Sequence, residues 1–114
     1  MADENFPDAA ESDTLIVLVT AASAEEAKTL ARTLVEEKLA ACVSRFPVQS
    51  TYTWEGKIEE DEEWQLVIKT HRRQFHSLQE RVQALHSYEV PEIIALPIDM
   101  GSAAYLNWIS HNVT

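Results

Sequence analysis

The strands expected from this sequence are apolar on consecutive positions, and this feature most constrains how the chain can fold. Three short segments of the 114-residue chain are apolar on nearly all consecutive positions, namely LIVLV (15–19), WQLVI (64–68, with Gln65 as its one polar residue) and IIALPI (93–98). A strand with one face in water alternates between apolar and polar residues, whereas a strand buried on both faces does not. The sequence therefore predicts a sheet that is covered on both faces.

Helical periodicity between these segments supplies the other elements. Ser23 and Glu26 form an S-x-x-E capping box. We expect the Ser23 hydroxyl to accept a hydrogen bond from the Glu26 amide, and the Glu26 carboxylate to accept one from the Ser23 amide. The expected elements are strand 14–20, helix 23–38, strand 41–54, strand 57–70, helix 72–86, strand 93–98 and helix 103–110. This order predicts an α+β, ferredoxin-like βαββαβ sandwich with a long hairpin and a short C-terminal helix.

The hairpin of strands 41–54 and 57–70, joined at Glu55 and Gly56, is longer than one domain needs. At about 3.3 Å per residue each strand would reach roughly 45 Å, so part of the hairpin should overhang its own domain. Pro47 cannot donate to a ladder, which predicts a sheet edge or a bulge. We interpret the acidic run 59–63 as a solvated hairpin tip, with a cation trap as the alternative.

The doubly apolar strands conflict with a single ferredoxin-like unit, in which two helices cover only one face of the sheet. No remaining segment of the chain is large enough to cover the second face. The cover should therefore be another copy of the chain or a partner, and the overhanging hairpin offers an edge that can link neighbours.

Charge and composition exclude several classes of function. The chain has 19 acidic and nine basic residues, and five of the acids lie in residues 1–13, which we expect to be a disordered acidic extension before a domain over 14–114. The acidic balance argues against nucleic acid and membrane as partners. The apolar runs, such as 15–19, are all too short to span a membrane. With no signal peptide in view, the expected location is cytoplasmic.

Candidate chemistry is concentrated in HSYEVPE, which places His86, Tyr88, Glu89 and Glu92 at a helix-to-strand junction. No phosphate-binding loop, nucleophile elbow or H-x-x-x-H pair is present. An imidazole with two carboxylates can bind a divalent ion or transfer protons. The alternative is a purely structural role. In that case Glu89 and Glu92 form caps or ion pairs with neighbouring residues, and a positively charged His86 interacts with the C-terminal end of its helix.

Several strings of the sequence resemble one known family. AACVSRFPVQSTYTWEGKIEEDEE, IKT, LHSYEVPEIIALPIDMG and YLNWI are similar to the CutA family of divalent-cation tolerance proteins, and the likeness covers nearly all of residues 14–109. The resemblance implies a very stable ferredoxin-like homotrimer, similar in build to the PII signalling proteins. It also implies binding of copper or another divalent cation, and no catalytic reaction.

The resemblance also assigns candidate metal ligands. Some bacterial members have copper ligands on a first-strand cysteine and on two adjacent residues of an H-H-P-Y stretch, and these positions correspond to Val19, Leu85 and His86. Only His86 retains a ligating side chain, so Glu89, Glu92 or a second subunit would complete a site. The expected metal set is thus His86, Glu89 and Glu92, with Cu²⁺ or another divalent cation bound and no obligatory cofactor.

A second candidate group comes from the same motifs. Tyr52, Trp54, Lys69 and Tyr88 resemble the lining of a cleft between subunits in the family, and the alternative is interface packing with satisfied polar tips. Cys42, the only cysteine, excludes an intrachain disulfide. It is expected to be a small buried residue, or a soft metal ligand where it faces a trimer cavity.

Three functions follow as hypotheses. The first is a non-enzymatic homotrimer that binds divalent cations, with copper as the expected ion, and confers tolerance to them. The second is a PII-like trimeric sensor that binds a small anionic ligand at the cleft between subunits. The third is a scaffold trimer that presents its tail or hairpin tips to other proteins.

Overall fold

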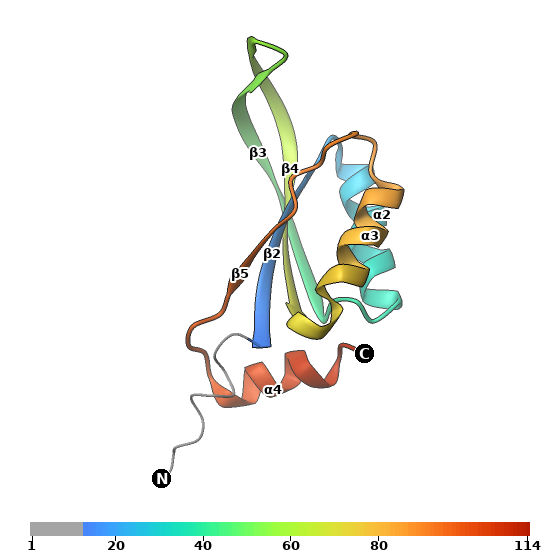
Figure 1. Cartoon of the computed structure of the whole chain (residues 1–114), viewed down its shortest axis with the longest axis vertical. Coiled ribbons are helices and arrows are strands. Elements are labelled where there is room, and N and C mark those ends of the chain that lie inside the picture. Colours follow the sequence, from blue (N-terminus) through green and yellow to red (C-terminus); the bar gives the residue numbers. More distant parts are fainter. Residues whose placement is uncertain (1–12) are drawn as a thin grey trace.

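The computed structural model describes residues 13–114, which form a four-stranded antiparallel sheet with two helices on one face and the C-terminal helix across the end of the sheet (Figure 1). The elements are β2 (Thr14–Ala21), α2 (Ala24–Glu36), β3 (Cys42–Trp54), β4 (Lys57–His71), the 3₁₀ turn η1 (Arg72–Gln74), α3 (Phe75–Leu85), β5 (Ile94–Pro97) and α4 (Ala103–His111). The strand order is β3-β4-β2-β5. The predicted ferredoxin-like α+β fold is confirmed. The predicted extension over 1–13 lies, apart from Asp13, outside the described residues.

The core lies between the sheet and the helices α2 and α3, which run side by side across one face (Figure 1). Alternate strand residues such as Val17, Val19 and Leu66 are completely buried there against Leu34 and Leu78. The burial of this face of the sheet is explained by two patterns: side chains alternate between the faces of each strand, and each helix has one apolar stripe that packs against the sheet.

The opposite face of the sheet is only partly covered. β5 is exposed along its whole length, with Ile94 at 50% and Leu96 at 47% exposure, although both side chains are large and apolar. Because these strands do not alternate between apolar and polar residues, the sequence predicts that a single copy leaves apolar strand side chains exposed to water. A covering second copy stays a prediction.

The long hairpin β3–β4 gives the molecule its elongated shape, 54 × 27 × 22 Å, and rises beyond the helical layer (Figure 1). Glu55 and Gly56 both adopt positive φ, 51° and 79°, which closes a two-residue turn between the paired Trp54 and Lys57. β3 is an edge strand, and its register continues through Pro47, which pairs with Trp64. The edge explanation for Pro47 is confirmed, and no bulge is needed.

Most predicted element ends differ from the structure by one or two residues, and two of the differences have a local cause. The helix expected over 72–86 starts with the 3₁₀ turn η1, because the His71 Nδ1 atom accepts from the Arg73 amide at 3.1 Å and tightens the first turn. The strand expected over 93–98 is limited to Ile94–Pro97, which is the length that pairs with β2. None of the helices described is long and apolar enough to cross a membrane.

Candidate functional site

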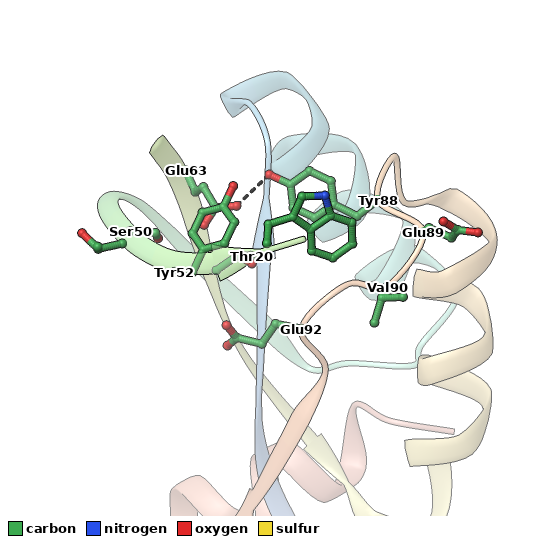
Figure 2. Close-up of a pocket in the computed structure, with 10 residues that line it drawn as sticks. Thr20, Ser50, Tyr52, Glu63, Tyr88, Glu89, Val90 and Glu92 are labelled. Carbon is green, nitrogen blue, oxygen red and sulfur yellow. Dashed lines mark hydrogen bonds between the residues drawn. The ribbon is translucent and has the colours of Figure 1, made fainter. Parts of the chain in front are cut away.

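A pocket of about 600 Å³ opens where the hairpin, the end of β2 and the loop between α3 and β5 meet (Figure 2). It is lined by Thr20, Ser50, Thr51, Tyr52, Trp54, Glu63, Tyr88, Glu89, Val90 and Glu92. Five of these residues are candidates from the sequence, drawn from both the predicted metal set and the predicted cleft group. Members of the predicted metal set and of the predicted cleft group therefore line the same pocket.

Strand alternation explains why the hairpin contributes these side chains. Tyr52 and Trp54 lie two residues apart on β3, and the pairing of β3 with β4 places Glu63 on the same face. That face is the one turned away from α2 and α3, since Leu66 and Ile68, at the opposite parity on β4, are buried in the helical core. The pocket thus lies on the sheet face that the helices leave open.

The floor of the pocket is a buried carboxylate held by a tyrosine. Tyr88 Oη donates to Glu63 Oε2 at 2.6 Å, and Glu63 is only 6% exposed (Figure 2). Burial raises the pKa of Tyr88, and the hydrogen bond to Glu63 raises it further. Tyr88 therefore remains a protonated donor at neutral pH.

A second tyrosine–carboxylate pair lies closer to the hairpin tip. Tyr52 Oη donates to Asp61 Oδ2. This hydrogen bond raises the pKa of Tyr52 to about 12, with smaller contributions from burial and from the neighbouring acids. Tyr52 is thus also protonated at neutral pH, and its ring stays fixed at the wall of the pocket.

The electrostatic character of the pocket is strongly acidic. Glu63, Glu89 and Glu92 contribute three carboxylates, and none of the ten lining residues, all within the described part of the chain, is basic. The partner seen for Glu63 is the neutral Tyr88 hydroxyl, which leaves a buried negative charge without a countercharge in the pocket. Such an arrangement favours a bound cation.

Glu26 anchors the loop that carries Tyr88, Glu89 and Glu92. Ser23 caps α2 as predicted, with Oγ accepting from the Glu26 amide at 3.1 Å. The predicted return bond is wrong: the Glu26 carboxylate accepts from the Ala22 amide at 3.0 Å and, across the fold, from Ser87 N at 2.7 Å and Ser87 Oγ at 3.0 Å. Burial alone would raise the pKa of Glu26, but these hydrogen bonds lower it overall.

His86, the candidate nitrogen ligand, is directed into the protein instead of the pocket. Its Nε2 atom lies 2.7 Å from the Thr20 carbonyl oxygen, its Nδ1 atom accepts from the Tyr88 amide at 3.0 Å, and its side chain is fully buried. With Nδ1 as the acceptor, Nε2 carries the proton and donates to Thr20. The imidazole therefore positions Tyr88.

The predicted metal set does not assemble within one chain. Among residues 13–114, no group of three or more His, Cys, Asp or Glu side chains is placed to hold a metal ion. Glu89 and Glu92 line the pocket, but His86 does not. Any metal site built on these carboxylates needs further donors.

Two other candidates lie away from the pocket. Lys69 and Cys42 pair directly across β4 and β3, at the end of the hairpin opposite to its tip. Lys69 is six residues from Glu63 along β4, or roughly 20 Å. Its Nζ atom lies 5.9 Å from the centroid of the Tyr105 ring on α4. Neither residue lines the pocket.

Sequence reasoning misses Glu63, because it belongs to the acidic run 59–63 that the pattern assigns to solvent. The rest of that run is largely exposed, as expected. The available signal is position: Glu63 directly precedes the apolar segment WQLVI, so it lies where the hairpin enters the body of the domain.

Comparison with known proteins decides the family. Residues 15–112 match the family model described as "CutA1 divalent ion tolerance protein". The chain belongs to the CutA1 family. A divalent-cation tolerance protein CutA of Thermus thermophilus is 51% identical over 98 residues, covering 85% of this chain and 95% of the relative.

Other members extend the comparison. A chloroplastic protein CutA of Arabidopsis thaliana is 48% identical over 99 residues, which cover 86% of this chain and 54% of the relative. The solved structure of a periplasmic divalent cation tolerance protein CutA from Archaeoglobus fulgidus superposes with a TM-score of 0.86 at 42% identity, covering 89% of this chain and 99% of that one. CutA1 members are thus named for tolerance to divalent ions and not for a reaction.

Proposed function

We propose that this chain forms a homotrimer that binds divalent cations without catalysing a reaction, and that the pocket at Glu63 is its cation site. The observation that carries the proposal is the charge of the pocket, which is lined by three glutamates and by no basic side chain among the residues described. Membership of a family named for divalent-ion tolerance supports the same ligand class.

The open sheet face supports the proposed trimer. Ile94, Leu96 and Phe46 are about half exposed on strands of the sheet, at 50%, 47% and 44%. Covering them with two further copies would bury apolar surface next to the pocket. Each Å² of apolar surface removed from water would stabilise the assembly by about 25 cal/mol. A neighbouring copy then supplies the remaining donors that one chain lacks. The single cysteine suits a reducing compartment, and we place the protein in the cytoplasm.

Carboxylate oxygens, with water and donors from the neighbouring copy, form the coordination shell in this proposal. Copper is the ion to test first, but His86 is not expected to be its main ligand, because both ring nitrogens are hydrogen-bonded inside the chain. The anionic-ligand sensor has no support from the charge of this pocket, since an anion would face Glu63, Glu89 and Glu92 without a countercharge.

Calorimetric titration of the chelator-treated protein with Cu²⁺, Zn²⁺ and Mn²⁺ tests the cation site. Glu92→Gln should weaken binding, whereas Glu25→Gln, an exposed acid on α2 outside the pocket, should not. Equal affinity in all three proteins would contradict the assignment. Sedimentation should give about three times the 12.9 kDa of one chain.

A further inference from the structure

We propose that the pocket also binds an organic cation, an aliphatic amine with two or more separated ammonium groups. The inference rests on the proposed function, because both require the pocket to be a cation site. It goes further in naming a ligand class that the shape and the walls of the pocket favour.

The size of the pocket favours an organic molecule. Its volume of about 600 Å³ lies in the range of sites that enclose small organic ligands. A divalent ion holds its oxygen or nitrogen donors within about 2.0–2.6 Å and fills only a small part of this volume. No group of three candidate side chains among residues 13–114 surrounds it in one chain, so its other donors would come from water or from a neighbouring copy. A bare ion would leave most of this space to water.

The walls of the pocket suit an ammonium group with an aliphatic chain. Tyr52, Trp54 and Tyr88 contribute three aromatic rings. Trp54 is 49% exposed, so its ring is accessible to a ligand in the pocket. Aromatic faces attract ammonium groups through their quadrupole and also pack against methylene groups. They give little to a hydrated divalent ion, so their presence discriminates between the two kinds of cation.

The carboxylates are spread around the pocket. Figure 2 shows Glu63 beside Tyr88, whereas Glu89 and Glu92 extend in different directions from the loop that leads to β5. A single ammonium group can contact only one of these positions closely. A chain with separated charges can place one ammonium group at the buried Glu63 and another at the rim.

Calorimetric titration of chelator-treated wild-type protein with spermidine tests the proposal. We expect saturable binding, weakened about tenfold or more in Glu63→Gln, because a charge-assisted contact in a buried site is lost. Glu62→Gln is the matched control, since it removes the same charge from the adjacent, exposed residue on the other face of β4. Its affinity should stay within about twofold of wild type.

A second variant keeps the test valid if Glu63→Gln does not fold. Trp54→Leu changes a half-exposed residue outside the core and should also weaken spermidine binding severalfold. Absence of binding at millimolar spermidine, or equal weakening in Glu62→Gln and Glu63→Gln, would overturn the inference. Binding of divalent ions that spermidine neither matches nor displaces would overturn it while leaving the proposed function intact.

Discussion

Replacing Glu26 by alanine should both destabilise the fold and loosen one wall of the pocket. The Glu26 carboxylate accepts three hydrogen bonds, one from Ala22 beside its own helix and two from Ser87 on the loop before β5. Ser87 directly precedes Tyr88, which holds Glu63. The substitution therefore removes the tie between the start of α2 and the loop that carries the pocket residues.

The size of the effect follows from these three bonds. A hydrogen bond to a charged group contributes about 1.5–3 kcal/mol, but water can partly replace the carboxylate at the exposed Ser87 and Ala22. We expect Glu26→Ala to lower the free energy of unfolding by about 2–4 kcal/mol, and Glu26→Gln, which keeps the shape and one acceptor oxygen, by about 1 kcal/mol. The control Glu25→Ala changes an exposed acid in the same helical turn and should cost under about 0.5 kcal/mol.

Urea denaturation at one fixed protein concentration measures these differences, since the stability of an oligomer depends on concentration. Because the pKa of Glu26 is lowered below 4.5 in the fold, its contribution is complete above pH 4.5 and is lost as the pH falls through the folded-state pKa. The gap between wild type and Glu26→Gln should therefore close in acid. A cost for Glu26→Ala no larger than for Glu25→Ala, or a gap independent of pH, would refute the reasoning.

Three further outcomes follow from the structure. Burial and the charge of Arg73 lower the pKa of His71, so stability should fall as the pH drops below 6.5; His71→Gln should flatten that part of the stability curve, and an unchanged slope would contradict it. Asp61→Asn should return the pKa of Tyr52 from about 12 toward 10 in an ultraviolet titration, unless the hydrogen bond to Asp61 is absent in solution. Leu78→Ala should cost about 2–5 kcal/mol in urea denaturation, because its side chain is fully buried; a cost under about 1 kcal/mol would mean that α3 is not packed as described.

The features predictable from the sequence are those decided by neighbouring residues. The cap at Ser23 needs only Glu26 three positions later, and the turn at Glu55 and Gly56 needs only residues that tolerate positive φ. Strand alternation by itself likewise places Tyr52 and Trp54 on one face of the sheet. These local rules are sufficient for the element order and for part of the pocket lining.

The features that escape prediction depend on contacts between distant segments. Glu63 is buried because Tyr88, 25 residues later, covers and binds it. His86 is turned inward by the Thr20 carbonyl, 66 positions away, and Glu26 reaches Ser87 across 61 positions. No spacing pattern in the sequence encodes these pairings, so a ligand set assigned from the HSYEVPE string alone gives His86 the wrong surroundings.

The most direct test of the cation pocket is a nuclear magnetic resonance titration of the ¹⁵N-labelled protein with Zn²⁺, a diamagnetic divalent ion. Three tryptophan indole N–H signals report on three places, because Trp54 lines the pocket whereas Trp64 and Trp108 do not. Zn²⁺ bound in the pocket should cause saturable shifts of the Trp54 indole and of the amides of Tyr88 and Glu89, with the Trp108 indole unmoved. Shifts centred on Trp108, or no saturable shift at Trp54, would contradict it.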